Sequence, residues 1–94
     1  MGRITGFDWD RGNTDKNWRS HGVSNQEAED VFSSARLRLM ADTEHSVAER
    51  RYAAHGTSAA GRQLAVFFTI RGSQIRIISA RDMSRKERRD YGKN

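Results

Sequence analysis

The stretch Gln74-Ile-Arg-Ile-Ile-Ser-Ala-Arg81 is the segment from which the other elements of this chain can be placed. Its alternation predicts a β-strand in which Ile75 and Ile77 face one side of a sheet and Arg76 faces the other. An arginine in mid-strand places a permanent cation on a sheet face, and its planar fork of five N–H donors suits phosphate or carboxylate. The basic segment 84–91 follows, so a basic strand leads into a basic helix.

Three more strands are predicted on the amino-terminal side of this one. Residues 63–70 form the most apolar run, with apolar side chains on both faces, which predicts a central strand. Residues 71–73 predict a hairpin turn between the two. Residues 49–55 predict a third strand that turns in the Ser/Ala/Gly-rich loop 56–61. Residues 36–40 alternate strictly, which predicts a half-buried strand with its arginines pointing outward.

The amino-terminal part of the chain predicts an edge strand followed by a helix. Residues 7–10 alternate aromatic and acidic side chains, which favours a short edge strand. Residues 11–19 predict a helix with Asp10 as its N-cap, because a carboxylate accepts hydrogen bonds from the first backbone N–H groups. Gly22 is expected to end this helix in the C′ position.

Two capping boxes predict the starts of two further helices. Ser24 and Glu27 form the first, and the helix that they start places one apolar stripe toward the core, made of Ala28, Val31 and Phe32. Ser84 and Glu87 form the second. The helix after it has almost no apolar stripe, so we expect charge or a partner, not burial, to hold it.

These segments predict a single domain over residues 1–94 with an α+β fold in the order β-α-α-β-β-β-β-α. Two amino-terminal helices would pack on one face of a mainly antiparallel sheet made by consecutive hairpins, and a short helix would end the chain. The sheet face without helices would carry the arginines. Leu, Ile, Val and Phe make up about 17% of the chain, below the roughly 20% under which disorder becomes a concern. The clear strand patterning argues against disorder, so a partner is expected to complete the fold.

The net charge of +5 is confined to one end of the chain. Residues 1–70 hold nine Lys/Arg and nine Asp/Glu, which cancel, whereas residues 71–94 hold eight Lys/Arg and three Asp/Glu. A localised positive field of this kind attracts a phosphate backbone or an acidic protein surface.

Several classes of protein are disfavoured by what the sequence lacks. There is no cysteine, hence no disulfide framework and no thiol nucleophile, and no apolar run approaches membrane-spanning length. We therefore expect a cytoplasmic protein without a membrane segment. The three histidines lack the short paired spacing of metal ligands, and no phosphate-binding glycine loop is present, so neither a metal nor a cofactor is expected.

A protein can cleave RNA without a metal if it has basic residues and a few acid–base groups, and this chain has both. The ribose 2′-OH attacks its own phosphate, so the protein supplies only a base, an acid and cations. Arginine is a poor base because its pKa is too high. The proton-transfer candidates, each of which also suits a structural or solvated role, are His45, His55, Glu49, Glu87 and Tyr91.

The chain resembles the BrnT toxins over nearly its whole length. The amino-terminal matches are Phe7-Asp-Trp-Asp10, Asn17, His21-Gly22-Val23-Ser24, Glu27-Ala28 and Val31-Phe32. The remaining matches are Asp42, His45-Ser46, Glu49, Arg51-Tyr52, the Gly56 turn, Arg76–Arg81, Glu87-Arg88 and Tyr91. Of these, Arg76–Arg81 and His21–Ser24 are the specific ones.

The resemblance implies a type II toxin–antitoxin ribonuclease with a RelE-like fold, which cleaves RNA, inhibits translation and growth, and is neutralised by a BrnA-like antitoxin. It also implies toxin dimers joined within the antitoxin complex. The positions expected to serve catalysis are Arg51, Arg76, Arg81 and Tyr91, together with His45 and Glu49. The positions expected to bind RNA on the last helix are Arg85, Lys86, Arg88 and Arg89.

Two other functions fit the same basic strand and helix. One is a non-catalytic module that binds nucleic acid or the ribosome, for which a steep salt dependence without cleavage would be typical. The other is a protein-interaction domain whose basic face docks an acidic partner. Cleavage of RNA separates the toxin from both.

Overall fold

A computed structural model of the chain describes residues 4–45 and 48–93. The strands are β1 (Gly6–Phe7), β2 (Arg38–Ala41), β3 (Tyr52–Thr57), β4 (Gln63–Arg71) and β5 (Gln74–Asp82). The helices are α1 (Lys16–His21), α2 (Asn25–Asp30) and α3 (Arg85–Gly92), with 3-10 turns η1 (Val31–Ser33) and η2 (Thr43–His45). The predicted order β-α-α-β-β-β-β-α is confirmed.

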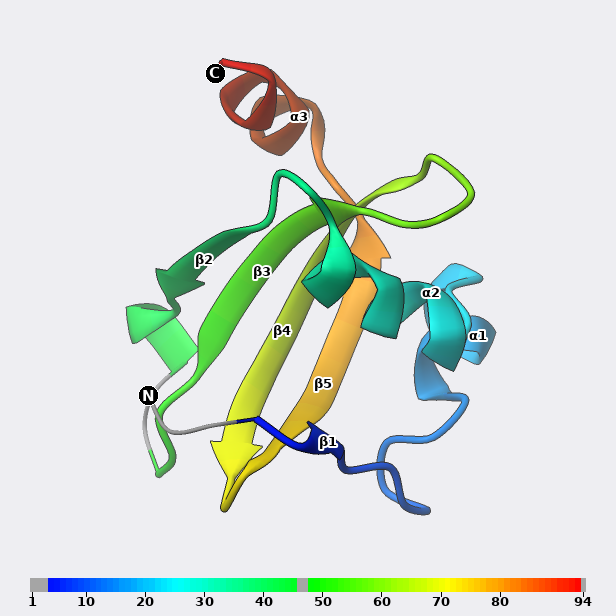
Figure 1. The fold of residues 1–94 in the computed structure, drawn as a ribbon, viewed down its shortest axis with the longest axis vertical. Coiled ribbons are helices and arrows are strands. Elements are labelled where there is room, and N and C mark those ends of the chain that lie inside the picture. The colour runs from blue at the N-terminus through cyan, green and yellow to red at the C-terminus, as the bar shows by residue number, and fades with distance from the viewer. Residues whose placement is uncertain (1–3, 46–47, 94) are drawn as a thin grey trace.

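The strands form one sheet in the order β1-β5-β4-β3-β2. Strands β2 to β5 follow one another as antiparallel neighbours, and β1 joins the outer edge of β5 in parallel. Figure 1 shows α1 and α2 next to β5, at the end of the sheet away from β2, and α3 beyond the end at which β5 leaves the sheet. The fold is therefore α+β with a mainly antiparallel sheet, as expected.

The main core lies between the sheet and the segment 23–33, which carries α2 and η1. Leu64, Val66 and Phe68 of β4 are at most 2% exposed, and they pack with Ala28 of α2 and Val31 of η1. The alternate residues of β4 face the other side, where a smaller cluster contains Ala65, Met83 and Tyr91. Residues on both faces of β4 are thus covered, and its predicted place at the centre of the sheet is confirmed.

A bulge in β5 lets residues on both sides of it face the main core. Phe68 pairs with Ile77 whereas Phe67 pairs with Ser79, so Ile78 is the extra residue. Without it, Ile77 and Ala80 could not both face the main core, because side chains alternate strictly along a regular strand. The bulge lies in the arginine-bearing strand, between Arg76 and Arg81.

Left-handed glycines end elements at the two predicted positions. Gly22 has φ 64° at the C-cap of α1, and its backbone N–H donates to the Trp18 carbonyl oxygen. Gly72 has φ 63° in the turn between β4 and β5. Both conformations are costly for residues that carry a Cβ atom.

Two amino-terminal boundaries differ from the prediction. The edge strand covers Gly6–Phe7 instead of 7–10, and α1 begins at Lys16 instead of residue 11. Asp10 caps a turn that precedes the helix, because its carboxylate accepts a hydrogen bond from the Gly12 N–H at 2.8 Å. The predicted start of the helix was wrong because an aspartate side chain can accept backbone hydrogen bonds in a turn as well as at a helix N-terminus.

The prediction for residues 36–40 was wrong in its burial. Every residue of β2 is exposed, with Leu39 at 49%, because β2 is the outermost strand and the helices do not reach over it. Its Arg38 does not point into solvent alone, since its guanidinium donates to the carbonyl oxygens of Asp90 and Lys93 at the end of α3. The next strand also begins later than predicted, at Tyr52.

The second predicted capping box is complete, and the first is not. Ser84 and Glu87 exchange both hydrogen bonds at the start of α3. Ser24 accepts from the Glu27 N–H at 3.1 Å, but the Glu27 carboxylate contacts Arg62 at 3.1 Å. A long-range ion pair has thus replaced the local bond that the spacing predicted.

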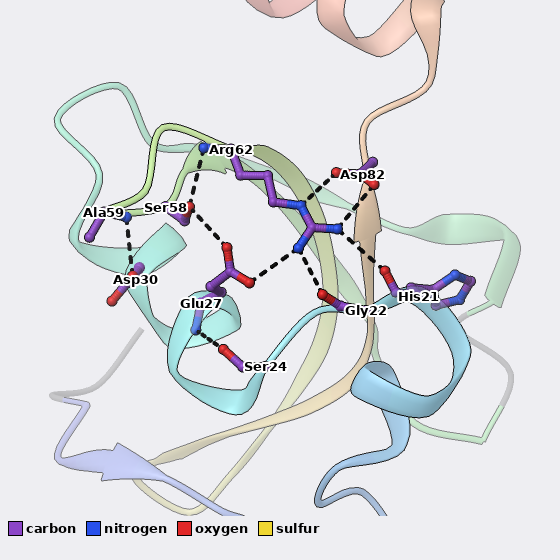
Figure 2. A network of polar contacts seen from close by, with 9 residues as sticks. All are labelled: His21, Gly22, Ser24, Glu27, Asp30, Ser58, Ala59, Arg62 and Asp82. Atoms are coloured by element: carbon purple, nitrogen blue, oxygen red, sulfur yellow. Dashed lines mark hydrogen bonds and ion pairs between the residues drawn. The ribbon is translucent and has the colours of Figure 1, made fainter.

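Arg62 joins segments that are distant in sequence, as Figure 2 shows. Its guanidinium donates to Asp82 at 2.9 Å, to Glu27, and to the Gly22 carbonyl oxygen at 2.8 Å. The hydrogen bond that Arg62 donates to Asp82, aided by the charge of Glu27, raises the pKa of Arg62 above its ordinary value. Arg62 therefore clamps the end of β5 to the α1–α2 connection and keeps the helices on their face of the sheet.

The prediction that burial does not hold α3 was wrong. Tyr91 and Met83 are each 2% exposed, and they pack against Ala65 on the sheet. Arg36 stacks on the Tyr91 ring, with its Cζ atom 5.1 Å from the ring centroid, and donates to the Tyr91 carbonyl oxygen. One large aromatic side chain is enough to dock so short a helix when its last carbonyls are also bonded.

No helix in the described ranges is both long and apolar enough to cross a membrane.

Candidate active site

The sheet face opposite α2 and the main core, here called the open face, carries the arginines of β5, as predicted. Arg81 pairs across to Ala65 and Arg76 pairs across to Thr69, and both partners face away from the main core. Two adjoining depressions hollow this face. The central depression is lined by Asp42, His45, Arg51, Phe67, Ile78, Ser79 and Arg81. The flanking depression is lined by Gly12, Asn13, Lys16, Glu49, Arg51, Thr69, Arg71, Arg76, Ile77 and Ile78.

The rim of the central depression carries an Asp–His pair. His45 is the last residue of the turn η2, and Asp42 immediately precedes that turn. The Nδ1 atom of His45 lies 3.1 Å from both carboxylate oxygens of Asp42. The Asp42 side chain is 13% exposed and that of His45 is 61% exposed, so the carboxylate is the fixed partner. A proton on Nδ1 would be donated to Asp42, which leaves Nε2 as an acceptor toward a substrate.

Arg81 crosses the central depression in a fixed orientation. Its two terminal nitrogens donate to the two carboxylate oxygens of Glu87, at 2.7 and 2.9 Å. Its Cζ atom lies 5.2 Å from the centre of the Phe67 ring. The hydrogen bond from Arg81 lowers the pKa of Glu87 to about 2, so the pair is ionised at neutral pH. Because Glu87 belongs to the capping box of α3, docking of that helix sets the position of the guanidinium.

Arg76 is held at the far side of the flanking depression. It donates to Asp10 at 2.9 Å, and its Nη1 lies 3.5 Å from Asp8. That hydrogen bond is the main cause of the lowered pKa of Asp10. A Cβ atom on Gly12 would lie 3.0 Å from the guanidinium, so a larger residue at this position would crowd the ion pair.

The structure does not bring Arg76 and Arg81 to one point. They lie five residues apart on β5, which the bulge reduces to four steps of the paired strand β4, or about 13 Å. Their guanidinium groups also turn to different elements, since Arg76 contacts Asp10 and Arg81 contacts Glu87. The two arginines thus line different depressions, although the sequence placed both in one catalytic set.

Arg51 and Glu49 precede β3 and both line the flanking depression. Arg51 lines both depressions, which makes it the cation common to them. Glu49 lines the flanking depression and pairs with Arg71 at 3.2 Å. The hydrogen bond from Arg71 lowers the pKa of Glu49, so this carboxylate is ionised at neutral pH and suits a proton acceptor better than a donor.

The remaining candidates lie outside both depressions. Tyr91 is buried under α3, and its hydroxyl oxygen is 3.4 Å from the Thr57 hydroxyl. His55 is half-buried, and burial lowers its pKa, so it is neutral at neutral pH. The basic residues predicted to bind RNA on α3 are all exposed: Arg85, Lys86, Arg88 and Arg89.

Substitution of Tyr91 separates packing from catalysis. We expect Tyr91→Phe to cleave RNA as fast as the unaltered protein, because the ring and its contacts remain. Tyr91→Ala should lower the free energy of unfolding by about 3 kcal/mol, since a buried aromatic ring is lost. Urea unfolding and a cleavage assay measure the two effects. Loss of cleavage in a stably folded Tyr91→Phe protein would restore the catalytic role that the sequence suggested.

Comparison with known proteins finds a family whose model matches most of this chain. The model of the family described as "Ribonuclease toxin, BrnT, of type II toxin-antitoxin system" matches residues 9–87. The chain belongs to the BrnT family. A comparison with curated proteins finds no match. Membership makes the chain a ribonuclease toxin of a type II toxin–antitoxin system, with RNA as substrate and an antitoxin as partner.

The BrnT match covers all residues that line the two depressions. It includes Asp42, His45 and Arg51 as well as Arg76 and Arg81, and it ends at Glu87, the residue that orients Arg81. Tyr91 lies beyond it. Sequence reasoning left Asp42 out of the catalytic set and gave no role to Lys16. Asp42 could have been found from its spacing, because a residue three positions before a histidine contacts it on a single helical turn.

Proposed function

We propose that this BrnT protein cleaves RNA in the central depression by attack of a ribose 2′-OH on the adjacent phosphate, with no metal ion. The single observation that carries the proposal is the Asp42–His45 pair on the rim of a depression that Arg51 and Arg81 also line. A base held by a carboxylate beside two cations suits proton removal next to a phosphate. Within the described residues, no three His, Asp or Glu side chains gather into a metal site.

The reaction divides between His45 and the arginines. His45 Nε2 takes the proton from the 2′-OH as the bond from that oxygen to phosphorus forms. The bond from phosphorus to the 5′-oxygen then breaks, and the leaving oxygen takes a proton from solvent. The products are a 2′,3′-cyclic phosphate and a 5′-hydroxyl end. Asp42 orients the imidazole ring and stabilises its protonated form.

Arg51 and Arg81 stabilise the charge that develops on the phosphate oxygens. Arg81 needs little reorganisation, because Glu87 and the Phe67 ring already fix its guanidinium. Donors that are fixed before the reaction contribute more than donors that must be ordered during it. The exposed cations of α3 continue the positive surface beyond Arg81, where they would contact the RNA backbone without sequence preference.

The partner is best explained as a BrnA-like antitoxin that covers the open face. The positive charge of the last quarter of the chain favours an acidic surface on that partner. A second, apolar groove lies on the other face beside the exposed β2 strand, lined by Ile4, Phe7, Phe32, Ser33, Leu37, Leu39, Phe68 and Ile75. An apolar helix of the antitoxin could bury it and join two toxin chains in one complex. The element order supports a RelE-like fold.

Incubation of the purified protein with RNA in excess chelator tests the proposal. We expect cleavage at the same rate as without chelator, and products that end in a 2′,3′-cyclic phosphate. Activity that chelation abolishes and Mg²⁺ restores would contradict the mechanism. RNA binding with a steep salt dependence but no cleavage under any of these conditions would favour the non-catalytic alternative.

A further inference from the structure

We propose that the flanking depression binds a second phosphate of the RNA, next to the one that is cleaved, and that Lys16 is its main contact. The inference rests on the proposed function of the central depression and extends it. It follows from the cations that line one small space, namely Lys16, Arg51, Arg71 and Arg76. Arg71 is paired with Glu49, and Arg76 with Asp8 and Asp10, whereas the hydrogen bond of Lys16 goes to a backbone carbonyl oxygen.

Lys16 lies where the two depressions meet. Its Nζ donates to the Ile78 carbonyl oxygen at 3.3 Å, and Ile78 lines both depressions. An ammonium group has three donors, and this contact uses one of them. Because Ile78 is the extra residue of the β5 bulge, the irregularity in the strand places the ammonium at the boundary of the two sites.

Buried contacts hold the segment that carries Lys16 onto β5. Asn17 is 2% exposed, and its side-chain oxygen accepts from the Ala80 N–H at 2.9 Å. Asn13 is 4% exposed, and its amide donates to the Ile77 carbonyl oxygen at 2.9 Å. These two bonds tie both sides of Lys16 to the strand, so its position over the depression does not depend on a ligand.

The separation of the arginines favours two phosphates over one. Arg76 and Arg81 lie about 13 Å apart along the sheet, because the bulge between them reduces their separation to four steps of β4. Asp10 holds Arg76 in one depression and Glu87 holds Arg81 in the other, so the two suit phosphates of consecutive nucleotides. Arg51 lines both depressions and would lie between the two phosphates. The flanking site would therefore add affinity for RNA that is longer than the scissile dinucleotide, without taking part in bond cleavage.

Cleavage of substrates of different length tests this role. We expect Lys16→Ala to raise KM about tenfold for an oligonucleotide, since one charged contact is lost. It should leave kcat/KM unchanged for the dinucleotide, which has only the scissile phosphate. Arg19→Ala is the matched control, because Arg19 is an exposed cation on the same helix outside both depressions. Dinucleotides that carry one added phosphate, at either the 5′ or the 3′ end, show on which side of the scissile phosphate the second phosphate binds. Lys16→Ala should slow cleavage only of the dinucleotide whose added phosphate reaches the flanking depression.

Binding measured in the inactive His45→Ala protein gives a readout that does not need cleavage. Lys16→Ala in that background should lower the slope of log affinity against log salt by about 0.7 for single-stranded RNA. Equal effects of Lys16→Ala on the dinucleotide and the oligonucleotide, or an unchanged salt slope, would overturn the second site. Failure of the unaltered protein to cleave any substrate, with the slope still reduced, would reject the proposed catalysis and leave the phosphate site standing.

Discussion

Replacement of His45 by alanine is expected to lower kcat for RNA cleavage about 10²–10⁴-fold, the range that a positioned acid–base group contributes. His45 is the exposed member of the Asp42–His45 pair, so its Nε2 can reach a 2′-OH in the central depression. KM should change little, because the imidazole removes a proton and does not hold the RNA backbone. Single-turnover cleavage of one oligonucleotide measures both quantities.

His21→Ala is the matched control, since His21 is an exposed histidine of α1 outside both depressions. It should retain full activity. Asp42→Asn keeps the size of the side chain but removes its charge, so we expect a smaller loss of kcat than for His45→Ala. A His45→Ala protein that melts normally and cleaves at the unaltered rate would remove His45 from the mechanism.

Replacement of Arg81 by alanine is expected to lower kcat about 10²–10³-fold, as loss of one fixed transition-state donor does. The size of the effect follows from the two bonds to Glu87 and the Phe67 ring, which fix the guanidinium before RNA binds. Arg81→Lys keeps the charge without the planar fork and should recover only part of the rate. Cleavage rates at saturating RNA measure these differences.

Arg85→Ala provides the comparison for this arginine, because Arg85 is exposed on α3 and outside both depressions. We expect it to raise KM and to leave kcat near its original value. Thermal melting is needed for each variant, since removal of Arg81 leaves the Glu87 carboxylate without its ion pair. Equal losses of kcat in Arg81→Ala and Arg85→Ala would show that charge alone, not a fixed geometry, serves the reaction.

Local patterns predicted the elements that depend on neighbours in sequence. The apolar run of β4 is buried on both faces, and Gly72 turns the chain into β5 with φ 63°. The burial of β2 was not predictable from its alternation. Leu39 is spaced as a core residue, but the strand lies at the edge of the sheet, beyond the reach of α1 and α2.

The candidate site was predicted as a set of residues but not as an arrangement. His45, Arg51 and Arg81 do line one depression. Arg76 belongs to the neighbouring depression, and Tyr91 to the contact between α3 and the sheet. A spacing pattern gives the face on which a side chain lies, but it does not give the partner toward which a long side chain turns.

The sequence by itself determined the order of elements, the strand that carries the arginines, and the BrnT family. It could do so because side-chain alternation, capping residues and glycine turns act within a few residues of one another. Only the tertiary structure decided how the charges are used. Arg76 meets Asp10 from 66 positions away, and Lys16 meets the Ile78 carbonyl oxygen from 62 positions away. Such contacts depend on which strands and loops become neighbours in space. The packing of the whole core sets these neighbours, and no local pattern reports it.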